Sequence, residues 1–506
     1  MLGTVHSCAI TGLDGVVLDV EADTSNGLPR HNVVGLPDAA VQEARERTRS
    51  AIRNSGAVFP ERRLTVNLAP ADIRKEGPVY DLPMAVAILA ATGQLEGFDD
   101  NQAVYLGELS LDGGVRHTHG VLPMVAAARD AGLDKAFVPS VDGAEAAVVE
   151  GISVYPVESL QQLIAHYMGL IRIEPLPVTE MSTRAASYPV DFADVRGHEH
   201  AKRALEVAAA GAHNVLMVGP PGSGKTLLAR ALPSVLPPMT LDEAIEVTKI
   251  YSIAGQLRDG AGLVVERPFR APHHTVTYAG MVGGGASPRP GEISLAHRGV
   301  LFLDEFPEFG RQTLESLRQP LEDGHITITR AAYSVDLPAR LMLVAAMNPS
   351  PSGFAASDDR GGGMSAEAAR RYRNRISGPL LDRIDVHIDV PRLQYAKMAD
   401  DTEREPSSHV QARIAGARKI QEERLAPHGF FTNAELTARL ISRICVLEPD
   451  AERLLRGAHD RLSLSGRGHH RVLKLARTIA DLSESETIRI EHLAEALQYR
   501  PTLDEN

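Results

Sequence analysis

The chain has 506 residues, more than a single hydrophobic core usually organises, so we expect about three domains. Hydrophobic residues make up 43% of the chain and charged residues 23%, which excludes a largely disordered protein. The formal net charge is −12, so a nucleic-acid-binding surface would have to be a local basic patch.

The cysteines and the apolar runs indicate in which cellular compartment the protein is expected. Cys8 and Cys445 have no spaced partners, which excludes a disulfide scaffold and fits a reducing compartment. The start of the chain lacks the pattern of a signal peptide. The longest apolar run, residues 82–92, is far shorter than the roughly 18 residues of a membrane helix. We therefore expect a cytoplasmic protein with no membrane partner.

The first block, residues 1–168, alternates short strand-like and helix-like segments and predicts an α/β domain. We expect strands at residues 4–11, 15–20, 64–68, 103–106 and 135–138. We expect helices at residues 38–54, 81–92 and 121–131, and a hairpin turn at residues 111–114. Residues 169–189 are rich in proline, serine and threonine without periodicity, which predicts a linker.

The second block, residues 190–395, contains three nearly uninterrupted apolar runs: Val215–Val218, Val300–Leu303 and residues 341–346. Such runs are typical of central parallel strands that are covered on both faces. The last block, residues 396–506, predicts only helices. The clearest is at residues 469–482, with Val472, Leu475, Ala476 and Ile479 as its buried stripe. The overall fold class is α/β with a helical C-terminal domain.

A phosphate-binding loop follows the first apolar run. The pattern G-x-x-x-x-G-K-[ST] is matched by Gly219, Pro220, Pro221, Gly222, Ser223, Gly224, Lys225 and Thr226, with a predicted strand before it and a helix after it. The glycines let backbone N–H groups wrap phosphates, Lys225 would reach the β- and γ-phosphates, and the Thr226 hydroxyl would ligate Mg²⁺.

Two further strand ends complete this pattern. The second apolar run ends in Asp304, predicted to face the Mg²⁺ ion, and Glu305, predicted to act on the attacking water. The third run ends near Asn348, whose amide can orient that water or touch the γ-phosphate. Together these residues predict hydrolysis of ATP with Mg²⁺ as the cofactor.

These motifs give the chain a specific resemblance to the magnesium-chelatase-like YifB/ComM family of AAA+ ATPases, within the group that also contains MCM helicases. Further strings carry the resemblance along nearly the whole chain, including residues 34–41, 67–78, 269–274, 283–286, 290–297 and 377–385. It implies a Lon-protease-like N-terminal domain, a AAA+ core and a helical lid of the magnesium-chelatase type. It also implies a ring, usually hexameric, in which each ATP site is completed by the neighbouring subunit.

Two arginines acquire a role only through this resemblance. Arg383 matches the arginine finger of the group, which would neutralise charge on the γ-phosphoryl of the neighbour. Arg471 matches the second sensor of the lid. Without the resemblance, each would be interpreted as a surface ion pair.

Two departures from the pattern of the family argue against a zinc site and against a protease site. Many relatives carry a cysteine cluster after the Asn-Pro pair that begins at Asn348, and this chain has none there, so we expect no zinc. The adjacent His273 and His274 are interpreted as structural rather than metal-ligating. In the Lon-like domain, Val79 takes the place of the serine nucleophile, and residues 120–125 contain no lysine base. We therefore expect a non-catalytic domain.

The resemblance favours a DNA motor that acts on recombination intermediates, as ComM-like proteins do in branch migration during natural transformation. The contacts to DNA would be independent of sequence and would come from the glycine-rich insert at residues 275–290 and the hairpin around Thr329 and Tyr333. The arginine group at residues 370–375 could instead serve a subunit interface. Two alternatives remain: the ATPase subunit of a metal chelatase, and a Lon-like protease or protease regulator.

Overall fold

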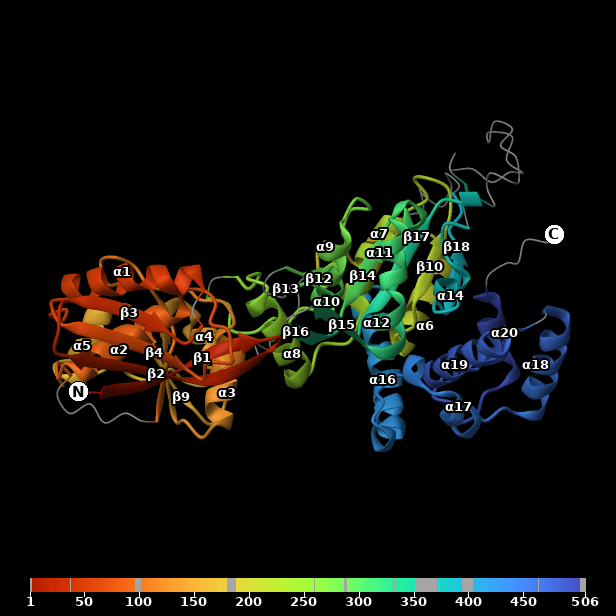
Figure 1. Cartoon of the computed structure of the whole chain (residues 1–506). Coiled ribbons are helices and arrows are strands. Elements are labelled where there is room, and N and C mark those ends of the chain that lie inside the picture. Colours follow the sequence, from red (N-terminus) through yellow and green to blue (C-terminus); the bar gives the residue numbers. More distant parts are fainter. Residues whose placement is uncertain are drawn as a thin grey trace.

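The computed structural model describes residues 2–36, 38–95, 102–179, 188–258, 260–285, 289–330, 333–350, 371–372, 374–393, 404–462 and 464–500. Figure 1 shows the chain as three bodies in a row. A mixed sheet with its helices lies at the N-terminal end, a parallel sheet lies in the middle, and a group of helices lies at the C-terminal end.

The N-terminal body is built on a seven-stranded sheet with the order β3-β4-β2-β1-β5-β8-β9. Its strands are β1 (Leu2–Thr11), β2 (Asp14–Ser25), β3 (Arg30–Val34), β4 (Arg63–Ala69), β5 (Ala103–Tyr105), β8 (Lys135–Pro139) and β9 (Ser153–Val157). Its main helices are α1 (Ala39–Asn54), α2 (Asp81–Ala91), α3 (Val121–Asp130), α4 (Gly143–Ala146) and α5 (Leu160–Tyr167). The strands and helices predicted for this block are all present, and the structure adds β3, β9, α4 and α5.

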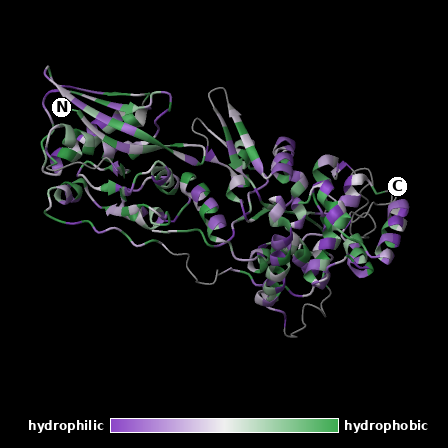
Figure 2. Cartoon of the chain, turned by 90° about the horizontal axis from the view of Figure 1, so that it is seen from below, coloured by the Kyte–Doolittle hydropathy of each residue, from purple (hydrophilic) through white to green (hydrophobic). Residues whose placement is uncertain are grey.

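The strands of this sheet alternate in burial because one face packs against the helices. Along β4, Leu64, Val66 and Leu68 are buried while their neighbours are not. Figure 2 shows the same alternation as hydrophobic bands between polar ones on the long strands. The predicted turn at residues 111–114 is confirmed, because β6 (Glu108–Leu109) and β7 (Val115–Arg116) pair antiparallel around it.

The middle body is a five-stranded parallel sheet with the order β11-β14-β17-β10-β18. The three predicted strands are confirmed as β10 (Val215–Val218), β14 (Val300–Leu303) and β17 (Met342–Met347), and the structure adds β11 (Phe269–Arg270) and β18 (Val386–Asp389). Its helices are α6 (Glu199–Gly211), α7 (Lys225–Ala231), α8 (Leu241–Ile253), α9 (Tyr278–Val282), α10 (Glu292–Leu295), α11 (Arg311–Ser316), α12 (Arg318–Asp323) and α14 (Gly378–Leu381).

Two antiparallel ribbons extend from this sheet. One pairs β12 (Gly283–Gly284) with β13 (Arg289–Pro290), and the other pairs β15 (His325–Arg330) with β16 (Tyr333–Pro338). The predicted hairpin around Thr329 and Tyr333 is therefore confirmed as a β-ribbon. It lies between β14 and β17 in the sequence, so it connects the strand that ends at Asp304 to the strand that ends at Asn348.

The C-terminal body contains α16 (Ser407–Leu425), α17 (Ala438–Ile444), α18 (Pro449–Leu462), α19 (Gly466–Leu482) and α20 (Ile490–Gln498). The predicted helix at residues 469–482 is α19. It begins three residues earlier because the Ser465 side chain caps it by accepting the N–H of Gly468. All four residues of the predicted stripe are buried, and they share one hydrophobic core with α6 and the parallel sheet.

The segment predicted as a linker begins as part of the N-terminal body. Ile173 is buried in the core of that body, and the N–H of Thr179 donates to the carbonyl of Ala147 at 2.8 Å. The sequence of this segment does not predict these contacts, because two isolated contact positions produce no periodic pattern. None of the described helices has the length and apolar character that crossing a bilayer requires.

Candidate nucleotide-binding site

Three strands of the parallel sheet carry the predicted site residues past their carboxyl ends. β14, β17 and β10 are neighbours in the sheet, and all three run in the same direction. Asp304 follows β14, Asn348 follows β17 and Gly219 follows β10. Parallel neighbours bring the three strand ends to one edge, so residues far apart in the sequence form one cluster.

The loop after β10 needs glycine at particular positions. A Cβ atom at Gly219 would lie 2.1 Å from the carbonyl oxygen of Val390, so no larger residue fits there. Gly222 and Gly224 have φ angles of +74° and +92°, in the left-handed region that favours glycine. The loop can therefore turn sharply and direct its N–H groups inward before α7 begins.

Lys225 connects this loop to the neighbouring strand end. Its Nζ donates to the carbonyl of Gly219 at 2.6 Å and to Oδ1 of Asn348 at 3.2 Å. Burial lowers the pKa of Lys225, and the charge of Asp304 opposes that shift. The amino group and the Asn348 amide thus converge on one point at the sheet edge.

Thr226 and Asp304 form the second contact across the cluster. The Thr226 hydroxyl donates to Oδ2 of Asp304 at 2.9 Å, and Oδ1 of Asp304 accepts the N–H of Glu305 at 2.9 Å. A hydroxyl and a carboxylate held together are hard oxygen donors of the kind that Mg²⁺ prefers. The residues predicted for Mg²⁺ therefore fit such an ion in their chemistry and in their placement.

Glu305 has an unusual backbone conformation and a partner that the sequence did not reveal. Its φ and ψ angles are 51° and 44°, in the left-handed region. Its Oε2 lies 3.1 Å from Nδ1 of His274, and 55% of the Glu305 side chain is exposed. His274, which the sequence indicates to be structural rather than metal-ligating, contacts a predicted catalytic carboxylate. The position of His274 just after β11, the strand beside β14, is the signal that could have indicated this contact.

The two predicted arginines lie at the other end of the sheet. Arg383 precedes β18, a strand that runs parallel to β10 and pairs Val386 with Val215. Its guanidinium binds the carbonyl of Pro379 at 2.6 Å and forms an ion pair with Glu322. Among the described residues, the buried Nε of Arg383 has no acceptor. Arg383 is thus separated from Lys225 of its own chain by the length of a strand.

Arg471 comes from α19 and joins this arginine. It donates to the carbonyl of Asp382 at 2.7 Å and lies 3.8 Å from a carboxylate oxygen of Asp385. Only 9% of its side chain is exposed. The structure therefore brings the two predicted arginines together, away from the phosphate-binding loop.

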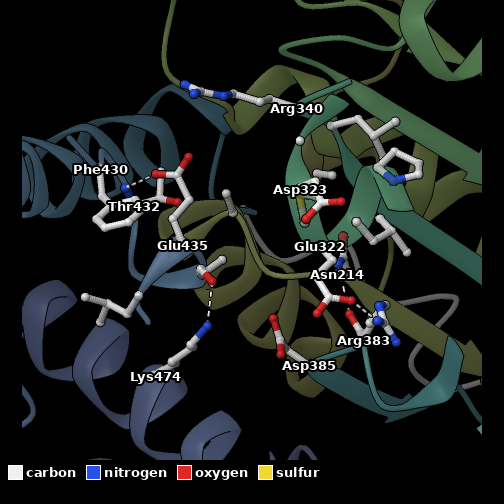
Figure 3. A pocket seen from close by; sticks show the side chains of 18 of the residues that line it. Asn214, Glu322, Asp323, Arg340, Arg383, Asp385, Phe430, Thr432, Glu435 and Lys474 are labelled. Atoms are coloured by element: carbon white, nitrogen blue, oxygen red, sulfur yellow. Dashed lines mark hydrogen bonds and ion pairs between the residues drawn. The ribbon is translucent and has the colours of Figure 1, made fainter. Parts of the chain in front are cut away.

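A cavity of about 600 Å³ opens beside them, between the sheet and the C-terminal helices. Figure 3 shows Arg383, Asp385 and Lys474 around this cavity, with Glu322 holding the Arg383 guanidinium. Arg467, in the first turn of α19, also lines it. Its side chain is 64% exposed and lies 3.8 Å from Asp382. Exposure makes Arg467 more accessible to a neighbouring molecule than Arg471.

Known proteins are similar to this chain along nearly its whole length. Residues 191–398 match the family model of magnesium chelatase subunit ChlI, and residues 20–142 and 404–500 match two further models of the same subunit. The chain is 43% identical to the competence protein ComM of Haemophilus influenzae over 505 residues, covering 99% of this chain and 97% of ComM. It is 41% identical to YifB of Escherichia coli over 507 residues, covering 99% and 97% of the two chains.

The chain belongs to the magnesium-chelatase-like YifB/ComM family of AAA+ ATPases. A more distant similarity, 27% identity over 169 residues, relates 31% of this chain to 17% of the DNA replication licensing factor mcm2 of Xenopus tropicalis. The predicted fold class is confirmed, and the chain is an ATPase of the AAA+ type, a class that in general uses ATP with Mg²⁺ and assembles into rings.

In this YifB/ComM-family chain, the region expected to resemble a protease site is apolar. Val79 is buried, and the first turn of α3 buries Val121, Leu122 and Met124. Of the arginine group at residues 370–375, the described Arg375 pairs with Glu308 at 2.8 Å, and Arg370 and Arg373 lie outside the described residues. Arg375 is thus engaged within its own chain.

Proposed function

We propose that this protein is a ring-forming motor that uses ATP to move along DNA without reading its sequence, and that it remodels branched DNA in recombination or natural transformation. The observation that carries this proposal is the β15–β16 ribbon. It is inserted, together with α11 and α12, between the strand that precedes Asp304 and the strand that precedes Asn348, so a polymer that contacts the ribbon is connected to the ATP site through the segments that carry both residues.

The two faces of the ribbon differ in chemistry. Ile326, Ile328, Val335 and Leu337 face the core of the middle body, whereas Thr327, Thr329, Ser334 and Asp336 are exposed. Short hydroxyl side chains and free backbone edges suit contacts to phosphate and sugar, which position a nucleic acid without specifying bases. At the end of the ribbon, Arg330 is paired with Tyr333 in the strand register.

The geometry described above supports the following roles. Lys225 would bind the β- and γ-phosphates, Thr226 and Asp304 would hold Mg²⁺, Glu305 would activate water, and Asn348 would orient it. Mg²⁺ bound there would neutralise charge on the phosphates. Since Arg383 and Arg471 lie at the opposite end of the sheet from Lys225, they act on the ATP of a neighbouring subunit, and this requires a closed ring.

The alternative functions make different demands. A chelatase ATPase would need a separate catalytic subunit. Family models of chelatase subunit ChlI match all three domains, so the preference for a DNA motor rests on the ribbon and on the full-length similarity to ComM. A Lon-type protease would need a serine and a lysine where this chain has Val79 and the apolar start of α3. Support for DNA comes from the ribbon, from the competence protein ComM and from the partial similarity to a replication factor.

The test is strand separation by the full-length protein on forked and four-way DNA, with ATP and with a non-hydrolysable analogue. We expect separation with ATP alone. The variant Thr327→Glu/Thr329→Glu should raise the DNA concentration for half-maximal ATPase stimulation by roughly 10-fold or more, because it adds charge that repels phosphate. Ser442→Glu, an exposed hydroxyl on α17, is the matched control. If DNA neither stimulates the ATPase nor is separated, the proposal is wrong.

A further inference from the structure

The N-terminal domain contacts the β15–β16 ribbon through the turn between β1 and β2. Leu13, at the tip of this turn, packs against the hydrophobic cluster that contains Ile328 and Val335. At the neighbouring Gly12, with a φ angle of +68°, a Cβ atom would lie only 3.0 Å from Cγ1 of Val335. Figure 1 shows the end of the β1–β2 hairpin beside β16. The turn thus rests directly on the buried face of the ribbon.

A second contact fixes the same domain to α8. The Ser252 hydroxyl accepts the N–H of Gly120 at 2.9 Å and donates to Oε1 of Glu145 at 2.5 Å. The same Glu145 oxygen accepts the N–H of Leu122 at 2.8 Å. The N-terminus of α3 and the last turn of α8 are therefore joined through one buried carboxylate.

Apolar side chains cross between the domains in both directions. Ile245 on α8 and Leu263 pack against the core of the N-terminal domain, while Leu13 packs against the core of the middle domain. Close packing of this kind resists sliding better than a polar contact does, because displacement would open voids on both sides. Two separate anchors also prevent rotation about either one.

We propose that the N-terminal domain is a brace that holds the β15–β16 ribbon at a fixed position, and that Leu13 is its positioning residue. The Glu145–Ser252 contact is the second anchor of this brace. A domain without a protease site then has a mechanical role, which is to keep the ribbon rigid within its own subunit. The consequence for DNA rests on the proposed function, whereas the brace itself does not.

The experiment compares amide hydrogen exchange in full-length wild type, Leu13→Ala and Leu13→Asn. Asparagine keeps a residue that favours turns and removes only the apolar contact. Leu28→Ala, an 89% exposed leucine of the same domain, is the matched control. We expect exchange at residues 325–338 to increase roughly 3- to 30-fold in both Leu13 variants. Exchange in β4 and β17 should remain at the wild-type level, as it should everywhere in Leu28→Ala.

A second readout separates the brace from the DNA function. In both Leu13 variants the DNA concentration for half-maximal ATPase stimulation should rise roughly 3- to 30-fold, with the ATPase rate without DNA unchanged. Unchanged exchange at residues 325–338 in both variants overturns the brace, whatever DNA does. If exchange increases there while DNA fails to stimulate even the wild type, the brace stands and the proposed DNA function is wrong.

Discussion

Lys225 and Arg383 lie beyond opposite ends of the paired strands β10 and β18. Lys225 binds the carbonyl of Gly219, just after β10, and Arg383 comes three residues before β18 begins. Four residue pairs join the two parallel strands, and at about 3.3 Å per residue they span about 13 Å. An arginine so placed cannot reach a phosphate held by the lysine of its own chain, so under the proposed function Arg383 acts on ATP bound by another subunit.

Lys225 and Glu305 should fail in different ways when they are changed. Lys225→Ala removes the charge that holds the phosphates, so ATP binding should be lost in a fluorescent-nucleotide titration. Glu305→Gln keeps binding and should reduce turnover by about 10²–10⁴-fold, because the group that activates water is gone. Glu308→Gln, whose carboxylate pairs with Arg375, is the control and should keep wild-type turnover. Equal ATP affinity in wild type and Lys225→Ala would contradict the assignment.

His274 lies within contact distance of the carboxylate of Glu305. Without the contact at 3.1 Å, that carboxylate is free to turn toward the phosphates. We therefore expect His274→Ala to raise the ATPase rate without DNA by about 2- to 10-fold, the effect of one hydrogen bond. The neighbouring His273, which bonds to Thr275, provides the control His273→Ala. A lower rate in His274→Ala would show that His274 holds Glu305 in its active position.

Arg471 and Arg467 are one helical turn apart, and both are expected to serve the ATP of a neighbouring subunit, but only Arg471 should also stabilise the fold. Arg471 is buried and bound to Asp382 and Asp385, so Arg471→Ala should lower the melting temperature by about 2–4 °C or more. Arg467 is exposed, so Arg467→Ala should leave the melting temperature unchanged and slow turnover at least about 10-fold. Differential scanning fluorimetry and ATPase assays measure both effects. If Arg467→Ala turned over ATP at the wild-type rate, Arg467 would have no role at the ATP site.

The sequence was sufficient for the phosphate-binding cluster and insufficient for the contacts around it. The motif at residues 219–226 and the ends of β14 and β17 are local signals, and parallel strands bring them together in any sheet with this order. The contact of His274 with Glu305 depends on β11, a strand of two residues with no detectable pattern. The pairing of Arg471 with Asp382 depends on how α19 packs on the sheet, which no spacing in the chain encodes.

The contact between the N-terminal and middle domains was likewise invisible in the sequence. Leu13 lies in an ordinary turn, and Glu145 lies in a helix of four residues. Each acquires its role from residues more than 100 positions away, which are the hydrophobic cluster of the middle domain for Leu13 and Ser252 for Glu145. Long-range packing, rather than local pattern, decides such positions.

Glu145 should make the stability of the joint depend on pH. Burial raises its pKa from 4.5 to about 7, although the hydrogen bonds from Ser252 and Leu122 oppose the shift. The folded state therefore binds a proton more tightly than the unfolded chain. The contribution of the protonated Glu145 to the stability of the folded state is complete below about pH 4.5, and it is lost as the pH rises through about 7.

Glu145→Gln remains neutral and can still accept both hydrogen bonds. As the pH rises from about 5 to about 8, the melting temperature of this variant should therefore increase relative to that of wild type. Scanning fluorimetry across this range measures the difference. Glu150→Gln, an exposed carboxylate of the same domain, should follow wild type throughout. A constant difference between Glu145→Gln and wild type would contradict the shifted pKa.

The central claim is that a ring hydrolyses ATP between subunits, with Glu305 from one chain and Arg383 from the next. Its most direct test is to mix Glu305→Gln with Arg383→Ala, each expected to be nearly inactive, the second by about 10³–10⁵-fold. Under conditions where subunits exchange, a mixed ring places an intact Glu305 beside an intact Arg383 at some interfaces. The account predicts that the ATPase rate passes through a maximum near equal proportions of the two variants. A rate that stays at the level of the single variants at every ratio, with mixed rings verified by native mass spectrometry, would contradict it.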